Sequence, residues 1–320
     1  MANTNNPATT WNCPNYTGEL FLIGANQTPF LNMIGGLQGG MIRTVGDFQF
    51  PLAQPWALEA AAQPSVTETA SLTAPDPWTY VRGQDVNTVQ IFHRAVTVSY
   101  AKQSVTGQIT ADPTTGLVDA TQQQPVQNER DFQIAAHMRQ IAVNADYTFL
   151  NGAYQQATDA GTAAKTRGII TACTTNSVNA GGAALSRLLV NSLIKSMADN
   201  GAQFMNTVIF CNAFQKQQIS EIYGYAPQDR NVGGLNINQI ETDFAMIGVV
   251  WAPNVPAATL LIADLAVCSP VFLPVPEKGV LFYEELSKTG AAEKGQIYGQ
   301  MGIDYGPEEY HGKITNLSTS

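Results

Sequence analysis

The chain has 320 residues, of which 44% are hydrophobic and only 13% are charged, and its formal net charge is −9. Charged residues make up about 25% of an average soluble domain and are depleted in interface cores, so this composition favours a surface largely covered by partners. The 16 basic residues are scattered, which argues against tight DNA binding because that needs clustered Lys and Arg.

The sequence also argues against several other classes of protein. The cysteines at 13, 173, 211 and 268 form no C-x-x-C pair, and we interpret them as reduced core thiols rather than as a metal or disulfide framework. No apolar run reaches about 18 residues, so no membrane span is expected. We find no dinucleotide or phosphate-binding fingerprint, and therefore expect neither a cofactor nor a metal.

The first 50 residues predict an arm followed by short helical turns. Residues 1–15 are polar and read as a flexible arm. The next stretch, "GELFLIGANQTPFLNMIGG", carries apolar residues at helical spacing. Pro29 interrupts it, and Gly35 and Gly36 end it.

Residues 60–110 predict an exposed ribbon of two strands, "SVTETASL" and "TVQIFHRAVTVSYAK". Neither face of these strands is purely apolar, and an isolated ribbon is marginal in water, so this one needs a surface to lie on. The tip, "APDPWTYVRGQDVN", contains Trp78, Tyr80 and Arg82, which are residue types enriched at interface anchors. The alternative is that the tip folds back on its own domain.

The stretch from Asp131 to Gly152 predicts one long amphipathic helix of about 35 Å. Its apolar face has spacings of three and four residues: Ile134, Met138, Ile141, Ala142, Ala145 and Phe149. The opposite face carries polar residues: Arg130, His137, Arg139, Asn144 and Asp146. We choose Arg139 on this polar face as a candidate interface residue.

A compact α+β domain of about a hundred residues follows Lys165. It contains the helices "LSRLLVNSLIKSMADNG" and "AFQKQQISEIYG" and the strands "TVIFCN", "MIGVVWAP" and "ATLLIADL". The loop "YAPQDRNVGGLNIN" is polar and Gly-rich. It fits a ligand lid or a junction between subunits equally well, and Arg230 within it is a second candidate interface residue.

The last part predicts a hairpin, with "GVLFYEEL" and "GQIYGQMGIDYG" as its strands and Ile297, Met301, Ile303 and Tyr305 on one face. Beyond it, Glu308, Glu309 and His311 suggest an acid–base cluster or a metal site. If this segment is a strand, Glu309 and His311 share a face. We interpret these three residues as a polar strand edge.

The order of these parts resembles the major capsid protein of tailed bacteriophages, which has the Hong Kong 97-type fold. The amino-acid sequence itself is also similar to this family in five stretches: "TGELFLIGANQTPFLNMIGG", "QPWALEAAAQPSVTET", "DFQIAAHMRQIAVNADYTFLNGAY", "TRGI" and "GQIYGQMGIDYGPEEYHGKI". The resemblance implies an α+β fold of five parts. These are an N-terminal arm with a first peripheral segment (1–50), an E-loop β-ribbon (51–118), a peripheral domain with the spine helix (119–172), an axial domain (173–272), and a peripheral β-hairpin return (273–320).

The resemblance also implies a function. The subunit would assemble with itself into hexamers and pentamers of the icosahedral head in the virion, which encloses double-stranded DNA. Further partners would be scaffolding, portal and decoration proteins. The type member of the fold cross-links an E-loop Lys to a neighbour's Asn, whereas Lys102 is the only Lys here before Lys165, so that chemistry is not carried over. The alternatives are a tail-tube or decoration protein, or a hydrolase using Glu308, Glu309 and His311.

Overall fold

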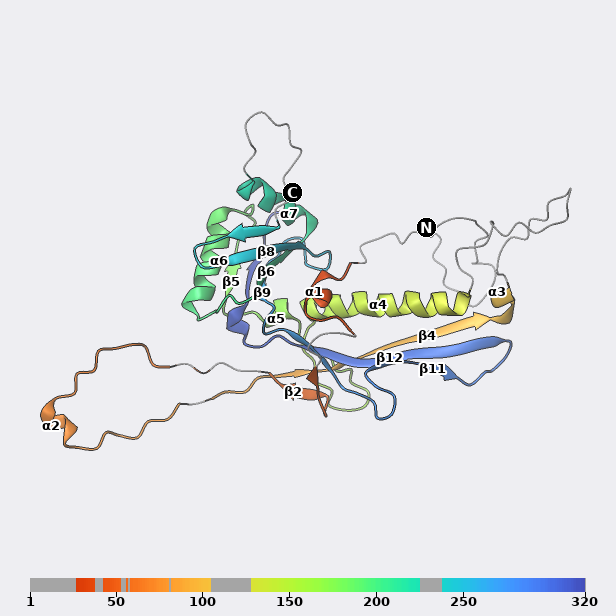
Figure 1. Cartoon of the computed structure of the whole chain (residues 1–320), viewed down its shortest axis with the longest axis horizontal. Coiled ribbons are helices and arrows are strands. Elements are labelled where there is room, and N and C mark those ends of the chain that lie inside the picture. The colour runs from red at the N-terminus through yellow and green to blue at the C-terminus, as the bar shows by residue number, and fades with distance from the viewer. Residues whose placement is uncertain are drawn as a thin grey trace, which may run out of the picture.

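The structure is a computed structural model that describes residues 27–37, 43–52, 56, 58–80, 82–104, 128–224 and 238–319. Figure 1 shows an elongated molecule in which one long helix, α4, lies along a sheet. A compact α+β part sits at one end of that helix, and a long loop reaches away from the body beyond it.

The long helix α4 spans Glu129–Asn151 and confirms the predicted rod. It begins after Asn128, whose side-chain oxygen accepts hydrogen bonds from the backbone N–H groups of the next residues, which satisfies donors that lack an intrahelical partner. It ends at Gly152, where an added Cβ would lie 2.4 Å from the carbonyl oxygen of Thr166. The predicted apolar face packs into the core, with Ile141, Ala145 and Phe149 fully buried.

The sheet beside α4 has five strands, and β12 (Ala292–Asp304) is at its centre. It pairs antiparallel with β11 (Leu281–Leu286), as predicted for the hairpin, and with β10 (Ser269–Phe272). β10 in turn pairs parallel with β1 (Arg43–Thr44). The four apolar residues predicted to share a face of this hairpin strand are buried: Ile297, Met301, Ile303 and Tyr305.

The fifth strand corrects the predicted ribbon. β4 (Gln90–Ser99) pairs antiparallel with β12, so it is a strand of the body and not half of an exposed ribbon. Residues 65–72, expected as its partner, contain the short helix α2 (Glu68–Ser71) instead. The physical reason is burial. A long ladder with β12 and contact with α4 bury Phe92, Val96 and Val98, which a free two-stranded ribbon cannot do.

Three short elements lie around this sheet. β2 (Gln49–Pro51) and β3 (Val86–Thr88) pair antiparallel and form the stem of the outstretched loop. α3 (Tyr100–Ser104) follows β4 directly. α1 (Pro29–Met33) begins at Pro29 and is followed by Gly35 and Gly36, both with positive φ, which agrees with the predicted helical turn and its end.

The compact α+β part is built on a six-stranded sheet, with the strands in the order β5-β13-β9-β6-β8-β7. The predicted helices and strands are all present: α6 (Arg187–Asp199), β6 (Thr207–Cys211), α7 (Ala213–Tyr223), β8 (Met246–Trp251) and β9 (Leu260–Asp264). β7 (Gln239–Glu241), β5 (Ser177–Asn179) and β13 (Gly312–Thr315) complete the sheet. Because β13 comes from the end of the chain, this part is not one continuous segment.

Two apolar clusters share the sheet strands of this part. One lies beneath α6 and contains Leu193, Met197 and Ile209. The other continues along α4 and α5 (Ile169–Ala172) into the five-stranded sheet. Cys173, Cys211 and Cys268 are buried free thiols, as predicted, and burial raises the pKa of Cys211 to about 12. Cys13 lies outside the described residues.

Candidate assembly surfaces

The outstretched loop between β2 and β3 carries a group of exposed apolar side chains. Trp56, Trp78 and Tyr80 form an aromatic cluster, with ring centroids 5.6 Å apart for Trp56–Tyr80 and 4.5 Å for Trp78–Tyr80. Trp78 is 60% exposed and Tyr80 is 47% exposed. Edge-to-face ring pairs of this kind are favourable, so the cluster presents a grouped aromatic surface to solvent.

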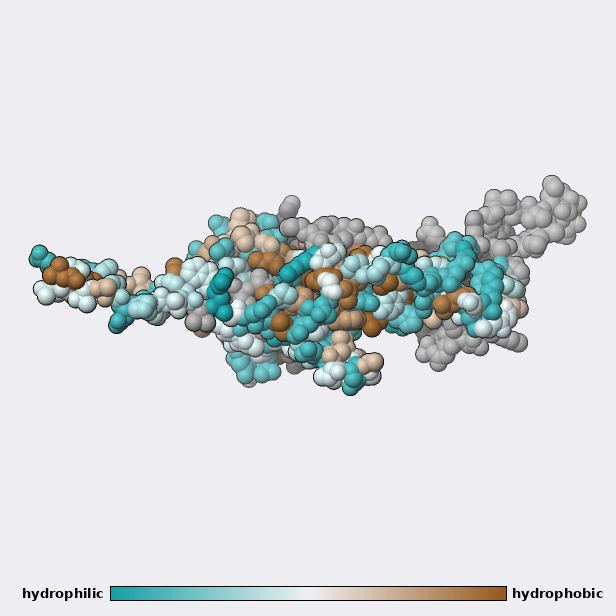
Figure 2. Space-filling model, turned by 90° about the horizontal axis from the view of Figure 1, so that it is seen from below, coloured by the Kyte–Doolittle hydropathy of each residue, from teal (hydrophilic) through white to brown (hydrophobic). Residues whose placement is uncertain are grey.

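The outer end of the loop is also apolar. Val66 is 72% exposed and Leu72 is 83% exposed, and they flank α2. Figure 2 shows hydrophobic residues gathered at this end. The outermost point of the loop is therefore α2 (Figure 1), and not residues 74–87 as the sequence indicated. Arg82 lies exposed on the arm that returns from α2 to the stem.

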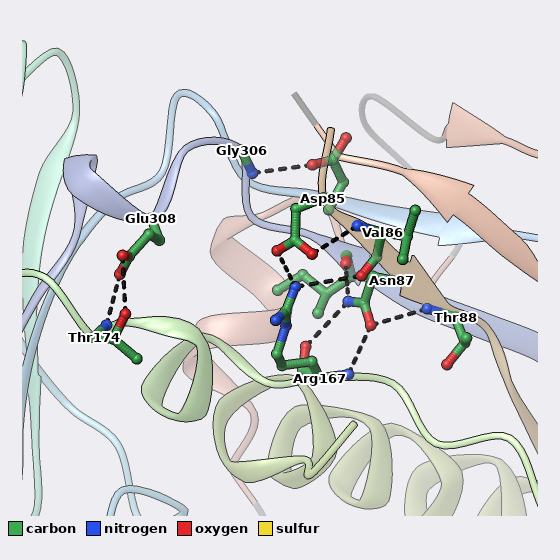
Figure 3. A network of polar contacts seen from close by, with 10 residues as sticks. Asp85, Val86, Asn87, Thr88, Arg167, Thr174, Gly306 and Glu308 are labelled. Atoms are coloured by element: carbon green, nitrogen blue, oxygen red, sulfur yellow. Dashed lines mark hydrogen bonds and ion pairs between the residues drawn. The ribbon is translucent and has the colours of Figure 1, made fainter. Parts of the chain in front are cut away.

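A buried polar network holds the stem of the loop (Figure 3). Asn87 is fully buried, and its Nδ2 donates hydrogen bonds to the carbonyl oxygens of Arg167 (3.2 Å) and Ile303 (2.9 Å). Its Oδ1 accepts from the backbone N–H groups of Arg167 (2.8 Å) and Thr88 (2.9 Å). One side chain thus joins the stem to the segment after α4 and to β12.

The Arg167 side chain contacts the same stem. It forms an ion pair with Asp85, and its guanidinium carbon lies 5.6 Å from the ring centroid of Tyr154 and 5.7 Å from that of Tyr305. Cation–π contacts of this kind are stabilising. Sequence analysis did not find Asn87 or Arg167 as positioning residues. The available signal was an Asn in the middle of the β-branched run "DVNTVQIF".

A buried carboxylate lies on α4, where the sequence predicted a solvent-facing polar residue. Asp146 is fully buried, which corrects that prediction. Its oxygens accept hydrogen bonds from the backbone N–H of Leu31 (2.8 Å) and from Nδ2 of Asn254 (2.7 Å). Burial raises the pKa of Asp146, although these hydrogen bonds oppose that shift. Asp146 therefore connects the spine helix to α1 and to the α+β part.

The two remaining candidate interface residues have different outcomes. Arg139 is exposed on α4 and lines a recess together with Thr28, Pro29 and Asn32 beside α1. Arg230 lies outside the described residues.

The residues suggested as an acid–base or metal cluster have structural roles. Glu308–Tyr310 is a 3-10 helix, which corrects the interpretation of these residues as a polar strand edge. His311 is fully buried, and its Nδ1 accepts from the backbone N–H of Asp264 (3.2 Å). Its Nε2 lies 2.6 Å from the carbonyl oxygen of Tyr305 and donates to it. Burial lowers the pKa of His311, which favours the neutral ring.

Glu308 is likewise engaged. It accepts hydrogen bonds from the backbone N–H and hydroxyl groups of Thr174 and Thr175 (Figure 3). Burial opposes its ionisation, but these hydrogen bonds outweigh burial and lower its pKa. Within the described ranges, no group of three or more His, Cys, Asp or Glu side chains is arranged to hold a metal ion. This geometry gives no support to a hydrolase.

Solved structures with the same arrangement show the fold of the chain. The capsid protein of cyanophage A-1(L) has a TM-score of 0.61 at 11% identity, with 96% of each chain covered. The capsid of the native GTA particle has a TM-score of 0.59 at 11% identity, also with 96% of each chain covered. The SrpI encapsulin of Synechococcus elongatus PCC 7942 has a TM-score of 0.55 at 8% identity, covering 97% of this chain and 93% of that one.

These likenesses show the Hong Kong 97-type shell fold, as the sequence predicted. The sequence matches the SU10 major capsid protein family over residues 2–318, and the chain belongs to that family. It is thus a structural protein that assembles with itself into a virion capsid. A comparison with curated proteins finds no match. No helix in the described part of the chain has the length and hydropathy needed to cross a membrane.

Proposed function

We propose that the chain forms hexamers and pentamers of an icosahedral head around double-stranded DNA, and that the loop of each subunit lies on its neighbour. The observation that carries this is the exposed apolar surface of a loop directed away from its own body (Figure 1). A patch on one part of a chain that fits a surface elsewhere on the next copy makes a head-to-tail contact. Such contacts close into rings when the rotation allows it.

The aromatic cluster is the proposed anchor of this contact. Trp78 and Tyr80 are held against each other before any partner arrives, so little side-chain entropy is lost on binding. Arg82 on the return arm adds a donor that remains charged. Arg139 and Arg230 remain proposed interface residues for other contacts of the subunit.

We propose the same five functional parts as the sequence indicated, with two elements reassigned. Residues 1–50, 51–118 and 119–172 form the arm with the first peripheral segment, the E-loop, and the peripheral domain with its spine helix. Residues 173–272 form most of the axial domain, and 273–320 form the hairpin return. Strand pairing supports moving β10 to the peripheral side and β13 to the axial side.

Other partners follow from the role of a head subunit. Scaffolding, portal and decoration proteins are proposed to contact the shell. The net charge of −9 suits a wall that encloses DNA without adhering to it, because like charges repel across the inner surface.

The test is assembly of loop variants. Residues 58–80 are replaced by a short Gly-Ser linker, and a second variant carries Trp78→Ala with Tyr80→Ala. Gln63→Ala, an exposed polar position on the same loop, is the matched control. Sedimentation and electron microscopy measure particles, and circular dichroism measures folding of the soluble subunit.

We expect the linker variant to fold without forming closed shells, and the double variant to give far fewer shells than Gln63→Ala. Normal shell yield from both loop variants would overturn the role given to the loop. Tubes formed by the unmodified protein would favour the tail-tube alternative, and discrete small particles a decoration protein.

A further inference from the structure

A groove lined by both apolar and polar residues lies on the compact α+β part, away from the outstretched loop. Its floor is formed by Val208 of β6 together with Gly248 and Val250 of β8. Three methionines line it from three different segments: Met33 at the end of α1, Met205 before β6, and Met246 at the start of β8. We call this the methionine groove.

The methionine groove has the properties of a site that a partner segment covers. Its three methionines are 43%, 58% and 64% exposed in chain order. Single exposed apolar residues are ordinary, but a contiguous exposed patch marks an interaction site. Methionine side chains are flexible and polarizable, so they adapt to aliphatic and aromatic groups. The occupant is therefore an apolar segment.

Polar groups in the groove fit a main chain as well as apolar side chains. Thr207 lines the groove and is only 4% exposed, yet its Oγ1 has no hydrogen-bond partner among the described residues. A buried hydroxyl without a partner costs free energy. Asn238 and Gln239 supply further donors and acceptors along the lining. A peptide segment entering the groove can satisfy these groups with its N–H and C=O groups.

The start of the same chain contains a segment with the required chemistry. Leu20, Phe21, Leu22 and Ile23 are consecutive, and Glu19 is the only charged residue among the first 26. The segment is tethered close to the groove, because the described chain resumes at Gln27 and Met33 lies six positions later at the end of α1. The residues of the apolar segment are four to seven positions from Gln27, a stretch of chain that can span up to about 14–25 Å. α1 itself rises by about 7.5 Å.

We infer that the apolar segment Leu20–Ile23 occupies the methionine groove of its own chain. The groove contributes soft apolar contacts, and Thr207, Asn238 and Gln239 bind the main chain of the segment. This contact would secure the N-terminal arm to the α+β part in the unassembled subunit. It does not depend on where the loop of a neighbouring copy lies.

The experiment is methionine oxidation by hydrogen peroxide on the soluble subunit, read residue by residue by mass spectrometry. Oxidation adds oxygen to the thioether of accessible methionines, so it reports directly on cover of the groove. The test variant carries Phe21→Ser and Leu22→Ser. The matched control, Asn5→Ser with Asn6→Ser, changes two polar positions in the same arm. Met197 and Met301, both 0% exposed, are internal references for folding.

We expect Met33, Met205 and Met246 to oxidise several-fold faster in the test variant than in the control, while Met197 and Met301 stay protected in both. Protection in the unmodified chain should not change on dilution, because the contact is within one chain. Equal, rapid oxidation of the three methionines in the unmodified chain and the test variant would overturn the inference. So would protection that disappears on dilution, since that would assign the groove to a second copy.

Discussion

Asn87 and Arg167 are eighty positions apart, yet the Asn87 amide exchanges two hydrogen bonds with the Arg167 backbone, at 3.2 Å to its carbonyl and 2.8 Å from its N–H. The Asn87 side chain therefore donates to and accepts from the Arg167 main chain, as the backbone of a paired β-strand does. The Arg167 side chain then returns to Asp85 on the same stem. These contacts of Asn87 and Asp85 with Arg167 therefore set the direction in which the loop leaves the body.

We expect Asn87→Ala to destabilise the subunit by about 1–3 kcal/mol, because it leaves buried backbone groups without partners. The measurement is the free energy of unfolding from urea titration. Gln84→Ala, at an exposed position three residues earlier, is the control and should change stability little. An unchanged free energy of unfolding for Asn87→Ala would mean that the Asn87 hydrogen bonds do not hold the stem.

Ala142→Pro is expected to abolish closed shells. Ala142 lies in the middle of α4, where proline removes a backbone hydrogen bond, clashes with the preceding turn and costs about 3 kcal/mol or more. The resulting kink displaces one end of the rod relative to the other. Asn144→Ala, which loses only a surface hydrogen bond with Gln140, is the control. Particle yield by gradient sedimentation decides the outcome, and normal shells from Ala142→Pro would contradict the spine role.

Asp146→Asn should loosen the contact between α4 and α1. The carboxylate accepts from Leu31 and Asn254, and an amide turns an N–H toward one of these donors. We expect a loss of about 1–3 kcal/mol in unfolding free energy. We also expect faster amide exchange at Leu31, measured by hydrogen–deuterium exchange. Unchanged exchange at Leu31 would show that α1 is held by apolar contacts instead.

Stability should fall as the pH drops below about 6.5, and His311 should account for part of that slope. Its pKa is lowered by burial, so the unfolded chain binds a proton before the folded chain does, and protons favour unfolding. The effect is absent well above the ordinary histidine pKa and reaches up to about 1.4 kcal/mol per pH unit below it.

His311→Gln is the test of this pH dependence. Glutamine remains neutral and can accept from Asp264 and donate to Tyr305, so the slope between pH 7 and pH 5 should shrink. The other ionisable groups near the ring, Asp264 and Glu308, are unchanged in this variant. His93→Gln on the exposed face of β4 should leave the slope as it is. Equal slopes for both variants would contradict the assignment.

Mature particles boiled in detergent should run as a single band near 34.3 kDa. Lys102 is buried and forms an ion pair with Glu129 at 2.8 Å, so its amine is not available to a neighbouring subunit. No lysine is present between residues 56 and 85 of the loop. A ladder of covalent multimers on the gel would contradict this prediction.

The elements with strong local signals were predictable from the sequence. The periodic apolar face of 131–152, the hairpin around β12, and the helices and strands from 185 to 264 all form as expected. In each of these, residues close in the chain determine the element, because apolar spacing selects a helix or a strand. The resemblance to capsid proteins rested on the order of these same elements.

Tertiary structure decided the features that depend on long-range partners. β4 became a body strand because β12, about two hundred residues later, offers it a ladder. Three polar side chains are buried because they form hydrogen bonds with distant segments: Asn87, Asp146 and His311. The local sequence does not predict such contacts. A polar residue gives the same local signal whether its hydrogen-bond partner is water or a backbone group from a distant segment.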